Sequence, residues 1–194
     1  MEEKVVDRRV RKTKRQLRLA LMKLMAEKSA KSISVRELTE RADINRGTFY
    51  IHYKDVYDLL SSLEDELADG LTVVCRRHNA KDSEGKTYPY LMELYQFIQQ
   101  NSDLCHVLLG KNGDIAFTDR ICHILRDEFL YDFLAYYYPN DPVMLDYFCS
   151  FIVSGNMSLA LTWIDNGMKQ TPEEMAVLAG EIIMHGVKVL ETKA

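Results

Sequence analysis

Asn45-Arg46-Gly47-Thr48-Phe49-Tyr50-Ile51-His52-Tyr53-Lys54 is the stretch that decides the fold of this 194-residue chain. Its basic, turn-forming start runs into a threonine and several aromatic side chains. Asn45 can cap a short helix over residues 46–52, because its side-chain oxygen accepts a hydrogen bond from a free N–H of the first turn. A helix this short and basic suits insertion into a DNA groove. Phe49 would anchor it to its own domain, and four side chains would face phosphates and bases: Arg46, Thr48, Tyr50 and Lys54.

A second short helix is predicted just before it. Ser34-Val35-Arg36-Glu37 forms a capping box, in which the Ser34 hydroxyl accepts from one free N–H and the Glu37 carboxylate reaches back to another. The box predicts a helix over residues 35–42, followed by Asp43-Ile44 as the turn. A capped helix, a turn and a groove-sized helix therefore follow one another directly.

The rest of the chain is predicted to be helical as well, because apolar residues almost nowhere alternate with a period of two. Asp7 can cap a first helix over residues 8–29, and Asp55 with Asp58 can cap a fourth that runs to about Arg77. Further caps, prolines and polar loops place the remaining helices over residues 89–100, 103–109, 115–137, 142–164 and 172–191.

Charge divides the chain near the start of the fourth helix. Residues 1–54 carry 15 basic and 7 acidic residues, a net charge of +8, whereas residues 55–194 carry 10 and 22, a net charge of −12. A basic unit on an acidic body indicates a polyanion-binding domain, with a merely solvated basic surface as the alternative. We therefore expect an all-α fold of about nine helices, with a helix-turn-helix DNA-binding domain at 1–54 and a larger helical domain at 55–194.

Composition excludes several other classes of protein. No apolar run approaches the roughly 18 residues that cross a membrane, and the charged N-terminus does not resemble a signal peptide. We expect a cytoplasmic protein without membrane contact, in which Cys75, Cys105, Cys122 and Cys149 are free thiols. Although Cys and His recur as near neighbours, they lack a repeated spacing on one helix face. Neither a metal site, a cofactor nor a catalytic Cys–His pair is predicted.

The segment from Ile44 to Tyr53 resembles the recognition segment of the TetR family of transcriptional regulators, which reads G-T-(L/F)-Y-x-(H/Y)-(F/Y). The resemblance is most specific over residues 33–60, and beyond them the helices match the family in number and length. It implies a transcriptional regulator, expected to be a repressor, that binds a palindromic operator in double-stranded DNA. The family binds DNA as a homodimer and is released by a small-molecule effector.

The resemblance also assigns roles to residues. It places Val35 and Arg36 against phosphates and base edges, and residues 46–48 at the groove-facing start of the recognition helix. Tyr50 and His52 match positions that contact phosphates. The predicted DNA-binding residues are Val35, Arg36, Asn45, Arg46, Gly47, Thr48, Tyr50, His52 and Lys54.

Side-chain chemistry supports these roles independently. Arginine pairs with guanine O6 and N7 in the major groove, and Gly47 lets the backbone approach the duplex. One position departs from the family, since Val56 stands where many relatives place a phosphate-binding lysine, and Lys54 can substitute for it. The basic residues of 8–12 resemble an arm that reaches a neighbouring groove, with an exposed basic surface as the alternative.

The last two helices are predicted to form the dimer interface, because two recognition helices must reach half-sites about one helical turn apart. Their apolar stripes consist of Phe148, Ile152, Gly155, Leu159 and Trp163 on the first, and of Met175, Leu178, Ile182 and Val189 on the second. Packing of these stripes inside one subunit is the alternative.

An effector pocket is expected among the fourth to eighth helices, where the resemblance places it and where aromatic residues are frequent. Tyr95, Phe129 and Phe133 are the predicted lining residues, with an ordinary core as the alternative. The acidic body favours a neutral or cationic aromatic effector over an anion. Its binding would lower DNA affinity by moving the fourth helix.

Two other functions stay open. The chain could be a DNA-binding regulator without a small-molecule pocket, controlled by a protein partner or acting as an activator, and an exposed apolar groove would favour that function. A small helical enzyme is the third hypothesis. It lacks a catalytic constellation and leaves the basic domain unexplained.

Overall fold

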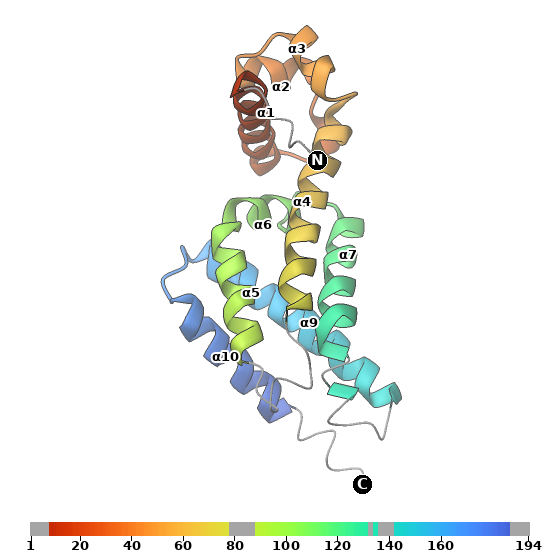
Figure 1. Cartoon of the computed structure of the whole chain (residues 1–194), viewed down its shortest axis with the longest axis vertical. Coiled ribbons are helices and arrows are strands. Elements are labelled where there is room, and N and C mark those ends of the chain that lie inside the picture. The colour runs from red at the N-terminus through yellow and green to blue at the C-terminus, as the bar shows by residue number, and fades with distance from the viewer. Residues whose placement is uncertain (1–7, 78–87, 132–133, 136–141, 187–194) are drawn as a thin grey trace, which may run out of the picture.

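The chain is helical and has no strand throughout the part that the computed structural model describes, which is residues 8–77, 88–131, 134–135 and 142–186 (Figure 1). The all-α prediction is confirmed. One end of the molecule consists of α1 (Arg8–Glu27), a short 3-10 turn η1 (Ala30–Ser32), α2 (Val35–Ala42) and α3 (Arg46–His52). Helices α2 and α3 have the predicted bounds, while the predicted cap Asp7 lies outside the described residues.

Helix α1 buries one apolar face and exposes a basic one. Leu17, Leu21 and Leu24 are fully buried, as expected from residues three and four positions apart on a helix. The helix ends at Glu27, two residues before its predicted end. The turn η1 follows, because the Ser32 N–H bonds the carbonyl three residues earlier (3.0 Å).

The capping box at the start of α2 forms only in part. Ser34 Oγ accepts from the Glu37 N–H at 3.2 Å, as predicted. The Glu37 carboxylate, however, pairs with the Lys28 ammonium at 2.7 Å instead of reaching back to Ser34. A charged donor is the stronger partner for a carboxylate. Glu37 therefore ties the end of α1 to α2.

Helix α4 (Val56–Arg76) joins the two ends of the molecule, as Figure 1 shows. Its start is capped as predicted, since Asp55 Oδ1 accepts from the Asp58 N–H (2.9 Å). The Asp58 carboxylate in turn accepts from the Lys54 N–H (2.8 Å). Arg18 on α1 pairs with Glu66 on α4 at 2.6 Å, so the two helices are also linked by charge.

The other end of the molecule is a bundle around α9. It contains α5 (Tyr88–Gln100), α6 (Ser102–Leu109), α7 (Ile115–Leu125), a π-helical turn η2 (Arg126–Leu130), α9 (Pro142–Asp165) and α10 (Pro172–Gly186). The helix predicted over residues 115–137 is therefore interrupted by a π-helical turn after Leu125, with α-helical residues again at 131 and 134–135, and its predicted end lies outside the described residues. The starts of α9 and α10 agree with the prediction, and a reciprocal capping box precedes α10: the Glu174 N–H donates to Thr171 Oγ1 (3.2 Å) and the Thr171 N–H to Glu174 Oε2 (2.7 Å).

The apolar stripe predicted for the dimer interface on α9 lies largely inside the subunit, so that prediction is wrong for most of its residues. Phe148, Ile152 and Trp163 are buried, because α9 packs against α5, α6, α7 and η2. On α10, Met175 is also buried, and Val189 lies outside the described residues. Helix α10 instead packs along α5 (Figure 1).

By length and composition alone, α9 could cross a membrane. The prediction that no segment of the chain is long and apolar enough to do so is therefore wrong for this helix. Polar residues interrupt its apolar runs, yet the helix as a whole remains apolar enough. Its packing against four other elements gives a reason for that composition within the fold. A core helix of a globular protein has the same composition as a membrane span.

Replacing Phe49 with alanine is expected to lower the free energy of unfolding by about 3–5 kcal/mol, because its ring is completely buried. Ile51→Ala, two residues along the same helix and 77% exposed, is the matched control and should change it by less than about 0.5 kcal/mol. Urea denaturation of both variants measures the difference. Equal losses would mean that Phe49 does not anchor α3.

Candidate nucleic-acid interface and internal cavity

Helix α3 is held at its start by a cap and underneath by one aromatic ring. Asn45 Oδ1 accepts from the Gly47 N–H at 2.8 Å. The Phe49 ring is fully buried and has Tyr50 edge-on at 5.4 Å and Tyr53 tilted at 5.9 Å between ring centres. The aromatic cluster therefore fixes the helix while leaving Tyr50 58% exposed.

The residues predicted to bind DNA lie at the surface of α2 and α3. Arg36, Asn45, Arg46, Gly47, Tyr50 and Lys54 are exposed, and Val35, Thr48 and His52 are half-buried. Val56, the position that departs from the family pattern, is buried. The Val56 side chain thus packs in the core, whereas Lys54 is exposed to solvent next to the first turn of α4.

The structure gives a reason for glycine at position 47 that the sequence did not indicate. A Cβ at this position would lie 3.3 Å from Asn45 Oδ1, the oxygen that caps α3. The glycine therefore makes room for the cap in addition to leaving the backbone open.

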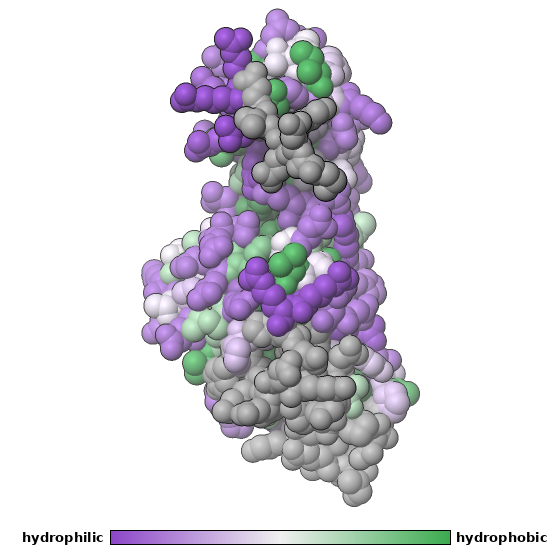
Figure 2. All heavy atoms as spheres, in the orientation of Figure 1, coloured by the Kyte–Doolittle hydropathy of each residue, from purple (hydrophilic) through white to green (hydrophobic). Residues whose placement is uncertain are grey.

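The cations of this surface differ in whether an acidic side chain already pairs with them. Arg36 pairs with Glu40 across one helical turn at 2.8 Å, and the hydrogen bond to Glu40 raises the pKa of Arg36. Among the described residues, Arg46 and Lys54 make no ion pair, so their charges face solvent. Strongly hydrophilic side chains also gather along the α1 side of this end of the molecule (Figure 2).

The predicted basic arm is helical. Arg8, Arg9, Arg11 and Lys12 all belong to the first turns of α1 and are exposed, so they form a basic surface rather than an extended arm. Sequence reasoning also missed a contact between α1 and the aromatic cluster, in which Lys14 Nζ lies 5.9 Å from the centre of the Tyr53 ring. A lysine nearly two turns into a basic helix gave no signal of this contact.

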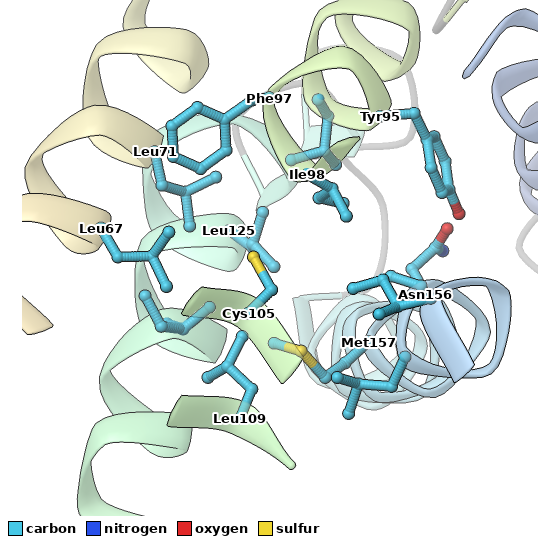
Figure 3. A pocket seen from close by; sticks show the side chains of 15 residues that line it. Leu67, Leu71, Tyr95, Phe97, Ile98, Cys105, Leu109, Leu125, Asn156 and Met157 are labelled. Carbon is cyan, nitrogen blue, oxygen red and sulfur yellow. The ribbon is translucent and has the colours of Figure 1, made fainter. Parts of the chain in front are cut away.

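A small cavity lies between α4, α5, α6, α7 and α9, in the region predicted to hold an effector (Figure 3). Its volume is about 50 Å³, and its walls are almost wholly apolar. Tyr95, one of the three predicted lining residues, lines it. The side chain of Phe129 and the whole of Phe133 lie outside what the structure describes.

Two polar atoms at the edge of this cavity stand out. The Tyr95 hydroxyl and Asn156 Oδ1 are both buried and have no hydrogen-bond partner among the described residues. In Figure 3 the two polar ends point toward each other from α5 and α9. The predicted lining set did not include Asn156, although a single asparagine within the apolar helix α9 was a visible signal.

Cys75, Cys105 and Cys149 are buried thiols, and Cys122 is half-buried. Burial raises the pKa of Cys75 and of Cys149 to about 11 and that of Cys105 to about 12, so these groups stay protonated at neutral pH. Cys105 lines the cavity. Within the described ranges no cluster of three or more His, Cys, Asp or Glu side chains could hold a metal ion, and His78 lies outside them.

One hydrogen bond connects the cavity-bearing part directly to α1. The Asn112 side-chain N–H, on the turn between α6 and α7, donates to the Met25 carbonyl at 2.9 Å. Helix α6 supplies Cys105 and Leu109 to the cavity wall. Movement of α6 would therefore reach the end of α1 through a short turn.

Comparison with known proteins matches both parts of the chain. Residues 17–63 match the family model for bacterial regulatory proteins of the tetR family, and residues 85–185 match the model for a transcriptional regulator C-terminal region. The "Uncharacterized HTH-type transcriptional regulator YxbF" of Bacillus subtilis (strain 168) is 26% identical over 184 residues, which is 90% of this chain and 45% of that protein. The chain thus spans about half the length of this curated relative.

Solved structures share the fold over nearly the whole chain. A TetR transcriptional regulator from Streptococcus agalactiae 2603V is 25% identical, with a TM-score of 0.64 over 91% of this chain and 96% of that one. The transcriptional regulator FadR from Bacillus subtilis, solved in complex with stearoyl-CoA, is 16% identical, with a TM-score of 0.60 over 88% of this chain and 97% of that one. The second likeness shows the fold alone.

Replacing Asn45 with alanine is expected to lower the free energy of unfolding by about 1 kcal/mol, because the Gly47 N–H loses its acceptor. Asn166→Ala, at an exposed position after α9, is the control and should have no effect beyond about 0.5 kcal/mol. Thermal and urea denaturation measure both. An Asn45 variant as stable as the control would show that the cap does not stabilise α3.

Proposed function

The chain belongs to the TetR family of transcriptional regulators, and from that premise we propose that it is a ligand-responsive repressor. In this proposal it binds a palindromic operator as a homodimer, and a small effector releases it. Family members are typically DNA-binding proteins without catalytic activity. The protein would act in the cytoplasm, where its operator lies, without contact to a membrane.

The observation that carries the proposal is the exposed, capped and anchored helix α3. Phe49 is buried beneath the helix and Arg46 is exposed at its start, where it would meet base edges, because arginine pairs with guanine in the major groove. Tyr50 and Lys54 are exposed beside it and would hold phosphates, which set the register rather than the sequence. Arg36 is paired with Glu40 in the free protein. On binding, its guanidinium would leave Glu40 and contact the DNA.

A face of α9 and α10 that the subunit leaves uncovered supports the homodimer. Val143, Tyr147 and Phe151 are 63%, 69% and 71% exposed and recur every four residues along α9, so they share one face. Leu178 and Ile182 of α10 are exposed at similar spacing. Exposed apolar patches of this kind mark protein contacts. We propose that this face, rather than the stripe through Trp163, meets a second copy of the chain.

Space along the same face suits close approach of two helices. A groove of about 340 Å³ runs past Phe151, Gly155 and Ile182. A Cβ added at Gly155 would meet no atom within 4 Å. The glycine is thus unnecessary for packing inside the subunit, and a neighbouring helix would give it a reason.

The apolar cavity between α4, α5, α6, α7 and α9 supports a small-molecule effector over control by a protein partner. Its walls include Leu67 and Leu71 of α4 and Cys105 of α6. A ligand that widens the cavity would tilt α4 and thereby change the separation of the two α3 helices in a dimer. The shift is limited to the ligand's difference in affinity for the two tilts. FadR with stearoyl-CoA illustrates that this fold can accommodate an apolar chain.

Binding to a palindromic duplex is expected to weaken with salt, with a slope of log K against log salt of about −0.9 for each phosphate contact. Lys54→Ala should reduce the slope by about one contact and weaken all sequences alike, and Tyr50→Phe should also weaken all sequences alike. Arg46→Ala should mainly relax base preference, by about 1–3 kcal/mol at one base pair. Lys169→Ala, exposed and on the opposite part of the chain, is the control. Selection from a random duplex library and salt titrations measure both effects.

A slope near zero would contradict the phosphate contacts. If the Arg46 variant selected the same consensus as the unchanged protein, Arg46 would not read a base.

Gly155→Trp is expected to convert the dimer into monomers without unfolding them, because the position is open within the subunit and bulky side chains separate facing helices. Val73→Trp, at an exposed position of α4, is the matched control and should leave the dimer intact. Sedimentation velocity at micromolar concentration measures the oligomeric state. A monomeric unchanged protein, or a dimeric Gly155 variant, would contradict the proposed interface.

A further inference from the structure

The cavity between α5 and α9 contains two polar atoms that the folded chain leaves unsatisfied. The Tyr95 side chain is 1% exposed, and neither its hydroxyl nor Asn156 Oδ1 has a hydrogen-bond partner in the described structure. A buried polar group without a hydrogen-bond partner destabilises a fold, because it has lost its hydrogen bonds to water. One polar group placed between these two atoms, at the edge of the apolar cavity, can satisfy both of them.

Both atoms are held in place by contacts of their own. The Asn156 amide nitrogen donates to the Ile152 carbonyl at 3.0 Å, which leaves its oxygen as the free acceptor. The Tyr95 ring meets Trp163 edge-on, with 5.6 Å between ring centres. The Trp163 ring N–H is itself bonded to the Gln170 carbonyl at 3.0 Å. Burial raises the pKa of Tyr95, so its hydroxyl keeps a proton that it can donate.

The two atoms together favour a neutral group that both accepts and donates a hydrogen bond. A hydroxyl can accept from Tyr95 and donate to Asn156 Oδ1 at the same time, so it satisfies both. A carboxylate offers no hydrogen to Asn156 and would be buried without a cation, because none of the described residues that line the cavity is charged. A ketone would satisfy Tyr95 only, and a cationic amine would lack an anion.

We propose that the effector of this protein is a neutral, mainly apolar alcohol whose hydroxyl lies between Tyr95 and Asn156. The inference rests on the proposed function, in which a small molecule enters this cavity. With about 50 Å³, the cavity has to widen to admit the apolar part. The unbranched Met157 side chain in its wall can move aside for it, since methionine has several rotatable bonds.

The test compares benzyl alcohol, toluene and benzoate as probes of the free protein, by calorimetry and by protein NMR, with no DNA present. Benzyl alcohol should bind, and benzoate should not. The ratio of the affinities for benzyl alcohol and toluene should fall about tenfold in Tyr95→Phe and in Asn156→Leu, because each loses one hydrogen bond to the hydroxyl. Use of the ratio removes the intrinsic difference in hydrophobicity between the probes.

Tyr90→Phe is the matched control, because Tyr90 lies on the same helix, is buried, and bonds Cys75 (3.6 Å) outside the cavity. It should leave the ratio unchanged. Tyr95→Phe should melt no lower than the unchanged protein, since its hydroxyl has no partner to lose, whereas Tyr90→Phe should melt lower. A purely structural role for Tyr95 would lower its melting temperature instead.

A ratio within twofold of the unchanged protein in both cavity variants would overturn the inference, as would binding of benzoate or of no probe. Operator release is measured separately. Failure to bind any duplex would contradict the proposed function without altering the affinity ratio, so the two failures are distinguishable.

Discussion

Helix α4 buries one apolar stripe against the DNA-binding helices at its beginning and against the cavity near its end. Leu59 and Leu63 are buried in the first half, and Leu67 and Leu71 continue the stripe into the cavity wall. Because a helix is stiff along its axis, its two ends cannot move independently. The cap at Asp55 and the ion pair between Arg18 and Glu66 attach the first half to the DNA-binding helices. Helix α4 therefore links the cavity wall directly to the DNA-binding helices.

A second connection runs beside α4. Helix α6 lines the cavity and leads into the turn in which Asn112 bonds the Met25 carbonyl. A ligand that pushes α6 outward would strain this bond and the end of α1. Both routes link cavity volume to the position of α3, and neither requires the ligand to touch the DNA-binding helices. The cavity is small and has two polar atoms without a hydrogen-bond partner among the described residues. A ligand that bonds these atoms would therefore stabilise a conformation with a wider cavity.

Local signals explain why α2 and α3 could be predicted to the residue. Side-chain caps at Ser34, Asn45 and Asp55 mark where α2, α3 and α4 begin, and such caps act over three residues. Faces of long apolar helices could not be predicted in the same way. Helix α9 is apolar nearly all round, so periodicity cannot tell Phe148, which is buried, from Phe151, which is exposed. Which of the two is buried depends on helices that are distant in sequence. The pairing of Glu37 with Lys28 likewise depends on a residue outside its own helix. Asn156 was missed because one polar residue has no periodicity.

Occupancy of the cavity is expected to change the separation of the two DNA-binding units in a dimer. Pulsed EPR between spin labels at Lys31, an exposed position of η1, measures this separation in a Cys122→Ser background, where the remaining cysteines are buried. The account predicts one narrow distribution of distances on a selected operator duplex, which shifts and broadens when benzyl alcohol is added. Absence of any distance between subunits, or a distribution that alcohol leaves unchanged while it occupies the cavity, would contradict it.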